Sequence, residues 1–214
     1  MNYEQLAIEL IPGAYEIISD LKLIPGLDKI RGGWIMRGMS NETIFDHNIK
    51  MGLACFFHSG GDVLEGHRGL IHDSCEGFKA FDATPHDNIS EVDKYDMELD
   101  TMIYIRDHFK LGPYYFELWN NTEDTKLNLR RDFKDKDKAC PFIECLKHNR
   151  AELTEEFRNC VKKNIHDKNF LEAILQLEKE HILGTDPYIR YFLMLQENPM
   201  LFLRKPLENQ GYFY

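Results

Sequence analysis

Apolar residues recur at helical spacing along almost the whole chain, and this periodicity constrains the fold more than any other feature. Between residues 3 and 22 the apolar positions are three or four residues apart, with an interruption near Pro12 and Gly13. Such spacing lines one face of a helix. Further helices are expected from Ser40, as capping residue, to about His58, and over residues 62–79, 89–110, 114–122, 124–138, 142–163, 167–182 and 186–196. Convincing alternation of apolar and polar residues, typical of strands, is absent, so the sequence predicts an all-α fold.

The length of 214 residues fits one domain, because domains usually have about 100–200 residues. We expect a single domain over residues 1–214, with a C-terminal helical portion from about residue 142. The apolar runs are far shorter than the roughly 20 residues that a membrane-spanning helix needs. The segment MNYEQLAIEL has acidic residues where a secretory signal has positive ones, so a cytoplasmic protein is expected.

The charge balance limits the partners. The chain has 26 Lys and Arg against 36 Asp and Glu, a formal net charge of −10, and no Lys/Arg-rich run. Binding to a nucleic-acid polymer depends on cationic patches, so neither a nucleic acid nor a membrane is the expected partner. A small anionic substrate remains possible if a few cations and a metal hold it. The five cysteines contain no CxxC pair, which disfavours a thiolate zinc site.

The first candidate for chemistry is His47. It lies three or four residues from Ile44 and Met51, so the imidazole shares a helix face with apolar side chains and should be buried. A single histidine on an apolar face is more often a core residue than a ligand. His47 therefore indicates a metal site only in combination with other groups.

A second segment supplies those groups. His72 and Asp73 are consecutive and differ by only about 100° around a helix, and Glu76 follows within one turn. Carboxylates beside a core-facing histidine are costly to bury unless a cation compensates them. A bound divalent metal would explain the group, and a helix with surface charges is the alternative.

A third segment can complete the ligand set. Phe133 and Asp137 are four residues apart, which places Asp137 on an apolar stripe within the charged run KDKDK. Asp135 is the second choice, and a solvated helix face is the alternative for the whole run. Two histidines and two carboxylates suit one divalent ion, with Mn, Co, Ni, Fe, Zn or Mg all possible.

The order His47, His72-Asp73, Asp137 resembles the H…HD…D signature of the HD-domain metal-dependent phosphohydrolases. The stretches RGGWIMRGMSNETIFDHNIKM (31–51) and LIHDSCEGFKAFDATP (70–85) are similar to segments of its 5′-deoxyribonucleotidase branch. The likeness covers about residues 25–140, the expected metal-site core. It implies an HD-domain helical bundle with additional C-terminal helices, a homodimer in many members, and release of phosphate from deoxynucleoside 5′-monophosphates.

The resemblance also implies roles for individual residues. The metal ligands are His47, His72, Asp73 and Asp137. The expected catalytic groups are Glu76, which would transfer a proton, and Asp82. The expected substrate-binding residues are Arg31 and Arg37 for the phosphate, Trp34 for sugar, base or pocket wall, and Thr84. The loop cations could instead be solvated, and Trp34 could instead anchor its loop to the core.

The expected function is therefore hydrolysis of small phosphomonoesters, above all (deoxy)nucleoside 5′-monophosphates, by a metal-activated water. A nucleoside di- or triphosphate hydrolase of the same fold is the first alternative, because the same water could attack another phosphorus. A non-catalytic module that binds nucleotide or metal is the second. The retained set of expected ligands together with Glu76 favours an enzyme.

Overall fold

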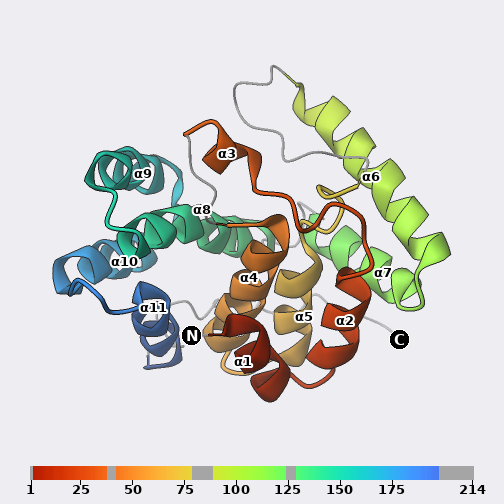
Figure 1. The fold of residues 1–214 in the computed structure, drawn as a ribbon, viewed down its shortest axis with the longest axis horizontal. Coiled ribbons are helices and arrows are strands. Elements are labelled where there is room, and N and C mark those ends of the chain that lie inside the picture. The colour runs from red at the N-terminus through yellow and green to blue at the C-terminus, as the bar shows by residue number, and fades with distance from the viewer. Residues whose placement is uncertain (1, 38–41, 79–88, 124–128, 198–214) are drawn as a thin grey trace, which may run out of the picture.

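The computed structural model describes residues 2–37, 42–78, 89–123 and 129–197, and within them it contains helices and no strand (Figure 1). This confirms the all-α prediction. The helices, in chain order, are α1 (Tyr3–Leu10), α2 (Ala14–Leu21), α3 (Gly32–Ile35), α4 (Ile44–His58), α5 (Val63–Ile71), α6 (Glu91–His108), α7 (Gly112–Glu123), α8 (Leu129–Lys147), α9 (Ala151–Asn164), α10 (Lys168–Glu180) and α11 (Pro187–Glu197).

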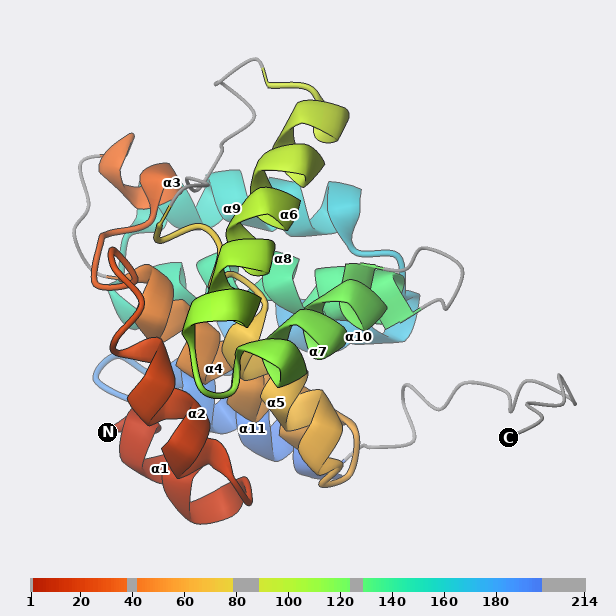
Figure 2. The ribbon, with the colours of Figure 1, turned by 90° about the vertical axis from the view of Figure 1, so that its right-hand side faces the viewer.

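Helix α4 is the centre of the bundle, with α5, α1, α8 and α11 packed around it (Figures 1 and 2). Its contact with α5 is close because Gly69 has no side chain. A Cβ atom at Gly69 would lie 2.4 Å from the carbonyl oxygen of Met51 and 2.6 Å from the amide nitrogen of Gly52. The two backbones therefore touch just before α5 ends.

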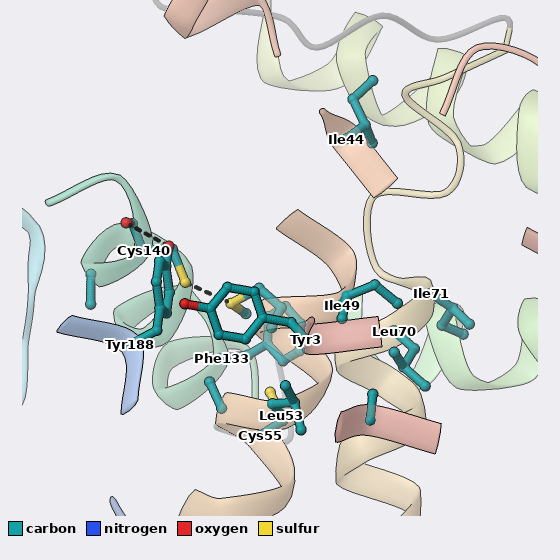
Figure 3. Packing of buried hydrophobic residues seen from close by; sticks show 14 of the residues in the cluster. Tyr3, Ile44, Ile49, Leu53, Cys55, Leu70, Ile71, Phe133, Cys140 and Tyr188 are labelled. Carbon is teal, nitrogen blue, oxygen red and sulfur yellow. Dashed lines mark hydrogen bonds between the residues drawn. The ribbon is translucent and has the colours of Figure 1, made fainter. Parts of the chain in front are cut away.

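One hydrophobic cluster extends from Tyr3 in α1 to Leu195 in α11. Figure 3 shows how the C-terminal part joins it: the Tyr188 hydroxyl donates to the carbonyl of Cys140 at 3.1 Å. This shared core supports the proposal of a single domain. Among the described residues, no helix has both the length and the apolar character to cross a membrane.

The start of α4 differs from the sequence prediction. Ser40 lies outside the described residues, and the helix begins at Ile44 with Thr43 as its cap. The Thr43 side chain accepts from the amide of Asp46, whose carboxylate accepts from the amide of Thr43. Thr43 itself is extended and forms an isolated antiparallel bridge with Ile30.

The expected helix over residues 62–79 is too long. Helix α5 ends at Ile71 with His72 as its C-cap, and turns follow over residues 72–78. The Ser74 hydroxyl donates to the carbonyl of Ile71, and Gly77 packs against the backbone of Leu27. The prediction that His72, Asp73 and Glu76 share one helical patch is thus wrong, because they lie at the C-cap of α5 and on the turns that follow it.

The expected break near residue 140 is also wrong, since α8 continues through Pro141 to Lys147. A proline inside a helix removes the hydrogen bond to the carbonyl four residues earlier, here that of Asp137. The neighbours Cys140, Phe142 and Ile143 are fully buried, so packing maintains the helix in spite of that loss. The break comes later, before α9.

The contact at Gly69 can be tested by adding one carbon atom. Gly69→Ala should lower the free energy of unfolding by about 1–3 kcal/mol, because the new Cβ meets backbone that cannot rotate away. Gly33→Ala is the matched control, since its Cβ would lie 3.6 Å from Arg37 Nη1, an ordinary contact. Urea unfolding followed by circular dichroism measures both. Equal stability of Gly69→Ala and the wild type would contradict the close contact.

Candidate metal centre

Four side chains from two helices and the turn after α5 gather at one point. His47 comes from the first turn of α4, His72 and Asp73 from the C-cap of α5 and the turn that follows it, and Asp137 from α8. Each offers one potential ligand atom, and these atoms all lie within 4.8 Å of one another. The four residues that the sequence singled out as metal ligands are therefore neighbours in space.

The shortest contacts run between imidazole nitrogens and carboxylate oxygens. Nε2 of His47 lies 3.2 Å from Oδ1 of Asp137 and 3.6 Å from Oδ2 of Asp73. Nε2 of His72 lies 3.2 Å from the same Asp73 oxygen. The two imidazole rings are 5.0 Å apart. Both Nε2 atoms thus face the carboxylates.

The imidazole rings of His47 and His72 are oriented so that a nitrogen of each can bind a metal ion. Nδ1 of His72 donates to the carbonyl of Gly69 at 2.8 Å, so in the neutral imidazole Nε2 carries the lone pair, on the side of Asp73. Nε2 of His72 and Nε2 of His47 are buried and have no partner in hydrogen-bonding geometry among the described residues. A buried polar atom without a partner costs about 1–3 kcal/mol, and a cation between these atoms would remove that cost. The residues present therefore fit a divalent metal.

The histidines respond differently to this environment. Burial and the nearby Arg31 lower the pKa of His47, which favours the neutral form that binds metals. Burial also acts to lower the pKa of His72, but the carboxylate of Asp73 outweighs it and the net shift is upward.

Both carboxylates are ionised at neutral pH. Burial alone would raise the pKa of Asp73, but His72 and Arg31 outweigh it and bring the pKa well below the ordinary value. Burial acts in the same way on Asp137, where Lys138 is the largest opposing influence and the net pKa is again lowered. The centre thus presents two negative oxygens.

Within the described residues, the side chains of Arg31 and Lys138 bring positive charge to within 4 Å of the carboxylates of the centre. Nη2 of Arg31 is 3.6 Å from Asp73 Oδ2 and 3.9 Å from Asp137 Oδ1, and its side chain is 14% exposed. Nζ of Lys138 is 3.2 Å from Asp137 Oδ2, with 46% of its side chain exposed. The sequence indicated Arg31 but missed Lys138, although its position next to Asp137 was a usable signal.

A fully buried carboxylate, Glu42, borders the centre and was also missed. Its Oε1 accepts from Lys50 Nζ at 2.8 Å and its Oε2 from Trp34 Nε1 at 2.9 Å. Burial alone would raise the pKa of Glu42, but Lys50, His47 and Arg31 outweigh it and lower the pKa to about 2. Glu42 lies within the stretch 31–51 that carries the resemblance, but its spacing does not mark it as a site residue, because its main partner, Lys50, is eight residues away.

Trp34 and Arg37, which were expected to contact the substrate, contact residues of α9 in the structure. Trp34 is 3% exposed and packs against Phe157, so its ring anchors α3 and its indole is not open to a ligand in this structure. Arg37 forms an ion pair with Glu156 and donates to the carbonyl of Gly33 at 2.6 Å. Both residues therefore join α3 to α9.

Glu76 is buried and follows Asp73 by three residues, but it is not one of the four residues that gather at the centre. Its Oε1 lies 3.4 Å from Lys94 Nζ, and the residue is 6% exposed. Asp82 and Thr84 lie outside the described residues, so their expected roles stay predictions. The second choice for a ligand, Asp135, has a structural role instead, because its carboxylate accepts from the amides of His166 and Asp167 ahead of α10.

Comparison with known proteins gives two relatives. The 5′-deoxynucleotidase HDDC2 of Dictyostelium discoideum is 27% identical over 173 residues, which make up 70% of this chain and 90% of that protein. The 5′-deoxynucleotidase hdd1 of Schizosaccharomyces pombe is 29% identical over 96 residues, 40% of this chain and 48% of that protein. No family model matches the chain, and no solved structure matches it. The similarity confirms that the chain is related to the HD-domain 5′-deoxynucleotidases, as its motifs indicated.

Proposed function

We propose that the chain is a metal-dependent phosphohydrolase that releases phosphate from (deoxy)nucleoside 5′-monophosphates. The observation that carries the proposal is the meeting of two buried imidazole nitrogens that lack partners with two ionised carboxylates. The names of the two relatives supply the substrate class. A cytoplasmic location and a homodimer remain predictions from the sequence and the resemblance.

We propose His47, His72, Asp73 and Asp137 as the ligands of one divalent ion. Two nitrogen and two oxygen donors suit Mn, Co, Ni, Fe, Zn or Mg, and this donor set alone does not choose among them. When bound, such an ion supplies positive charge for a phosphoryl oxygen and lowers the pKa of a water molecule. Four protein ligands leave room for solvent and substrate in a six-coordinate site.

Arg31 and Lys138 are the proposed phosphate-binding residues. Each has a nitrogen within 4 Å of a carboxylate of the centre, so each can turn toward a phosphate bound beside it. The guanidinium of Arg31 can donate to two phosphate oxygens at once, whereas the ammonium of Lys138 acts as a point charge. Lys138 is half-exposed and can therefore follow a substrate as it enters.

Glu76 is the proposed proton-transfer group. It follows the ligand Asp73 by three residues, and its amide donates to the carbonyl of Asp73 at 3.0 Å, which ties its position to the centre. Its Oε1 pairs with Lys94 Nζ, and a carboxylate so placed is a type of group that transfers protons in catalysis. Asp82 and Thr84 remain proposed contacts to the nucleoside or the leaving oxygen.

A panel of nucleotides tests the proposal directly. We expect phosphate release from deoxynucleoside 5′-monophosphates in the presence of Mn²⁺, Co²⁺ or Mg²⁺, loss of release with EDTA, and recovery when the ion is restored. Colorimetric measurement of phosphate checks this, with 3′-monophosphates as control. Release from di- or triphosphates alone would indicate the alternative hydrolase. If the protein binds the ion but hydrolyses none of the nucleotides, the result would favour the non-catalytic binding module.

Two carboxylates on α8 offer a matched pair of variants. Asp137→Asn should weaken ion binding by more than about 100-fold, because even outer-shell partners of a metal are worth about 10- to 100-fold. Asp135→Asn should keep the ion but lower the free energy of unfolding by about 1–3 kcal/mol, since it loses charged acceptors ahead of α10. Elemental analysis and urea unfolding measure the two effects. Equal ion content in both variants would count against Asp137 as a ligand.

A further inference from the structure

We infer that Glu42 is a positioning residue of the metal centre, which holds His47 through Nδ1 and directs Arg31 toward the bound phosphate. The inference rests on the proposed function, because it takes His47 as a metal ligand. It adds a residue that is neither one of the proposed ligands nor part of the H…HD…D signature.

The carboxylate of Glu42 is fixed on both sides. The residue is 0% exposed, and it lies directly before the capping residue of α4. Lys50 holds Oε1 at 2.8 Å, and the indole of Trp34 holds Oε2 at 2.9 Å. With both oxygens tied to buried donors, the carboxylate cannot turn away from the centre without breaking one of these bonds.

The oxygen held by Trp34 is the one that faces the centre. Oε2 of Glu42 lies 4.0 Å from Nδ1 of His47 and 4.0 Å from Nη1 of Arg31. Nδ1 of His47 is buried, and no hydrogen-bond partner for it lies in the part of the chain that the structure describes. A neutral imidazole has one N–H group, and the nearby Glu42 oxygen is the acceptor that would keep it on Nδ1.

The consequence for His47 is a defined tautomer. With the proton on Nδ1, Nε2 presents its lone pair to Asp73 and Asp137, where the ion is proposed to lie. His72 shows the same arrangement with another acceptor, because its Nδ1 donates to the carbonyl of Gly69. Partners of this kind fix the orientation of a metal-bound histidine and increase its basicity.

Glu42 also sets the direction in which the guanidinium of Arg31 points. Nη1 faces Glu42, while Nη2 faces Asp73 and Asp137. Because a guanidinium is planar and rigid, an acceptor on one side sets the plane of the other side. Glu42 thereby connects the orientation of a metal ligand with that of the proposed phosphate-binding cation.

Glu144 provides a matched control within the same network. It is also 0% exposed, and its Oε2 also accepts from Lys50, at 2.5 Å. Its Oε1 pairs with His148, which is not part of the centre. Like loss of charge at Glu42, loss of charge at Glu144 removes a carboxylate partner from Lys50, but it leaves the acceptor beside His47 in place.

The test compares Glu42→Gln and Glu144→Gln in the full chain. Calorimetric titration of the metal-free protein with Co²⁺ should show affinity about 10- to 100-fold weaker for Glu42→Gln and close to that of the wild type for Glu144→Gln. Urea unfolding of both variants separates a change of affinity from a loss of the fold. Equal affinity of Glu42→Gln and the wild type, or equal losses in the two variants, would overturn the inference.

A measurement on the wild type covers the case in which Glu42→Gln does not fold. Nitrogen-15 NMR of the Zn²⁺-loaded protein should show His47 protonated at Nδ1, and protonation at Nε2 would overturn the inference. Wild-type protein that binds neither Co²⁺ nor Zn²⁺ would overturn the proposed function together with the role of Glu42. Binding by the wild type with unchanged binding by Glu42→Gln would overturn the role of Glu42 alone.

Discussion

The backbone contact between α4 and α5 at Gly69 determines the position of the centre. Because residue 69 has no side chain, the carbonyl of Met51 can approach it, and the end of α5 is pressed against α4. This brings His72 to within 5.0 Å of His47, measured between ring centroids. The carbonyl of the same glycine accepts from His72 and sets the direction of its free nitrogen. One small residue therefore controls both the spacing of the two histidines and the orientation of one of them.

The charges around α4 and α8 alternate in sign. Glu144 and Asp137 are seven residues apart on α8, which places them on one face about two turns from each other. Lys50 of α4 lies between Glu144 and Glu42, and Arg31 follows between Glu42 and the aspartates. Such a buried series is costly to desolvate, and each member is tolerated because a neighbour of opposite charge contacts it. The series ends at the two aspartates, which together with the histidines make the proposed cation site.

One side of the site is fully buried, and the other is partly exposed to solvent. His47 and Glu42 are fully buried, whereas Asp73 and Asp137 keep 17% and 20% of their side chains exposed. Of the two described cations beside the ligand set, Lys138 is the more exposed. A small anion could therefore approach from the side of α8, while α4 supplies the fixed wall. This arrangement suits a phosphate ester better than a polymer, in agreement with the negative net charge of −10.

The sequence by itself determined the helical class, most of the helices and the four side chains of the centre. Apolar periodicity is a local property, and the order of His47, His72, Asp73 and Asp137 is readable as a motif. The sequence did not determine where α5 ends or that α8 passes through Pro141, because turn contacts at Ser74 and Gly77 and burial of the residues around Pro141 decided these points. It also did not reveal Glu42 or the structural role of Asp135. Only the tertiary structure decided these, since the role of a carboxylate depends on which distant donors the fold brings to its oxygens.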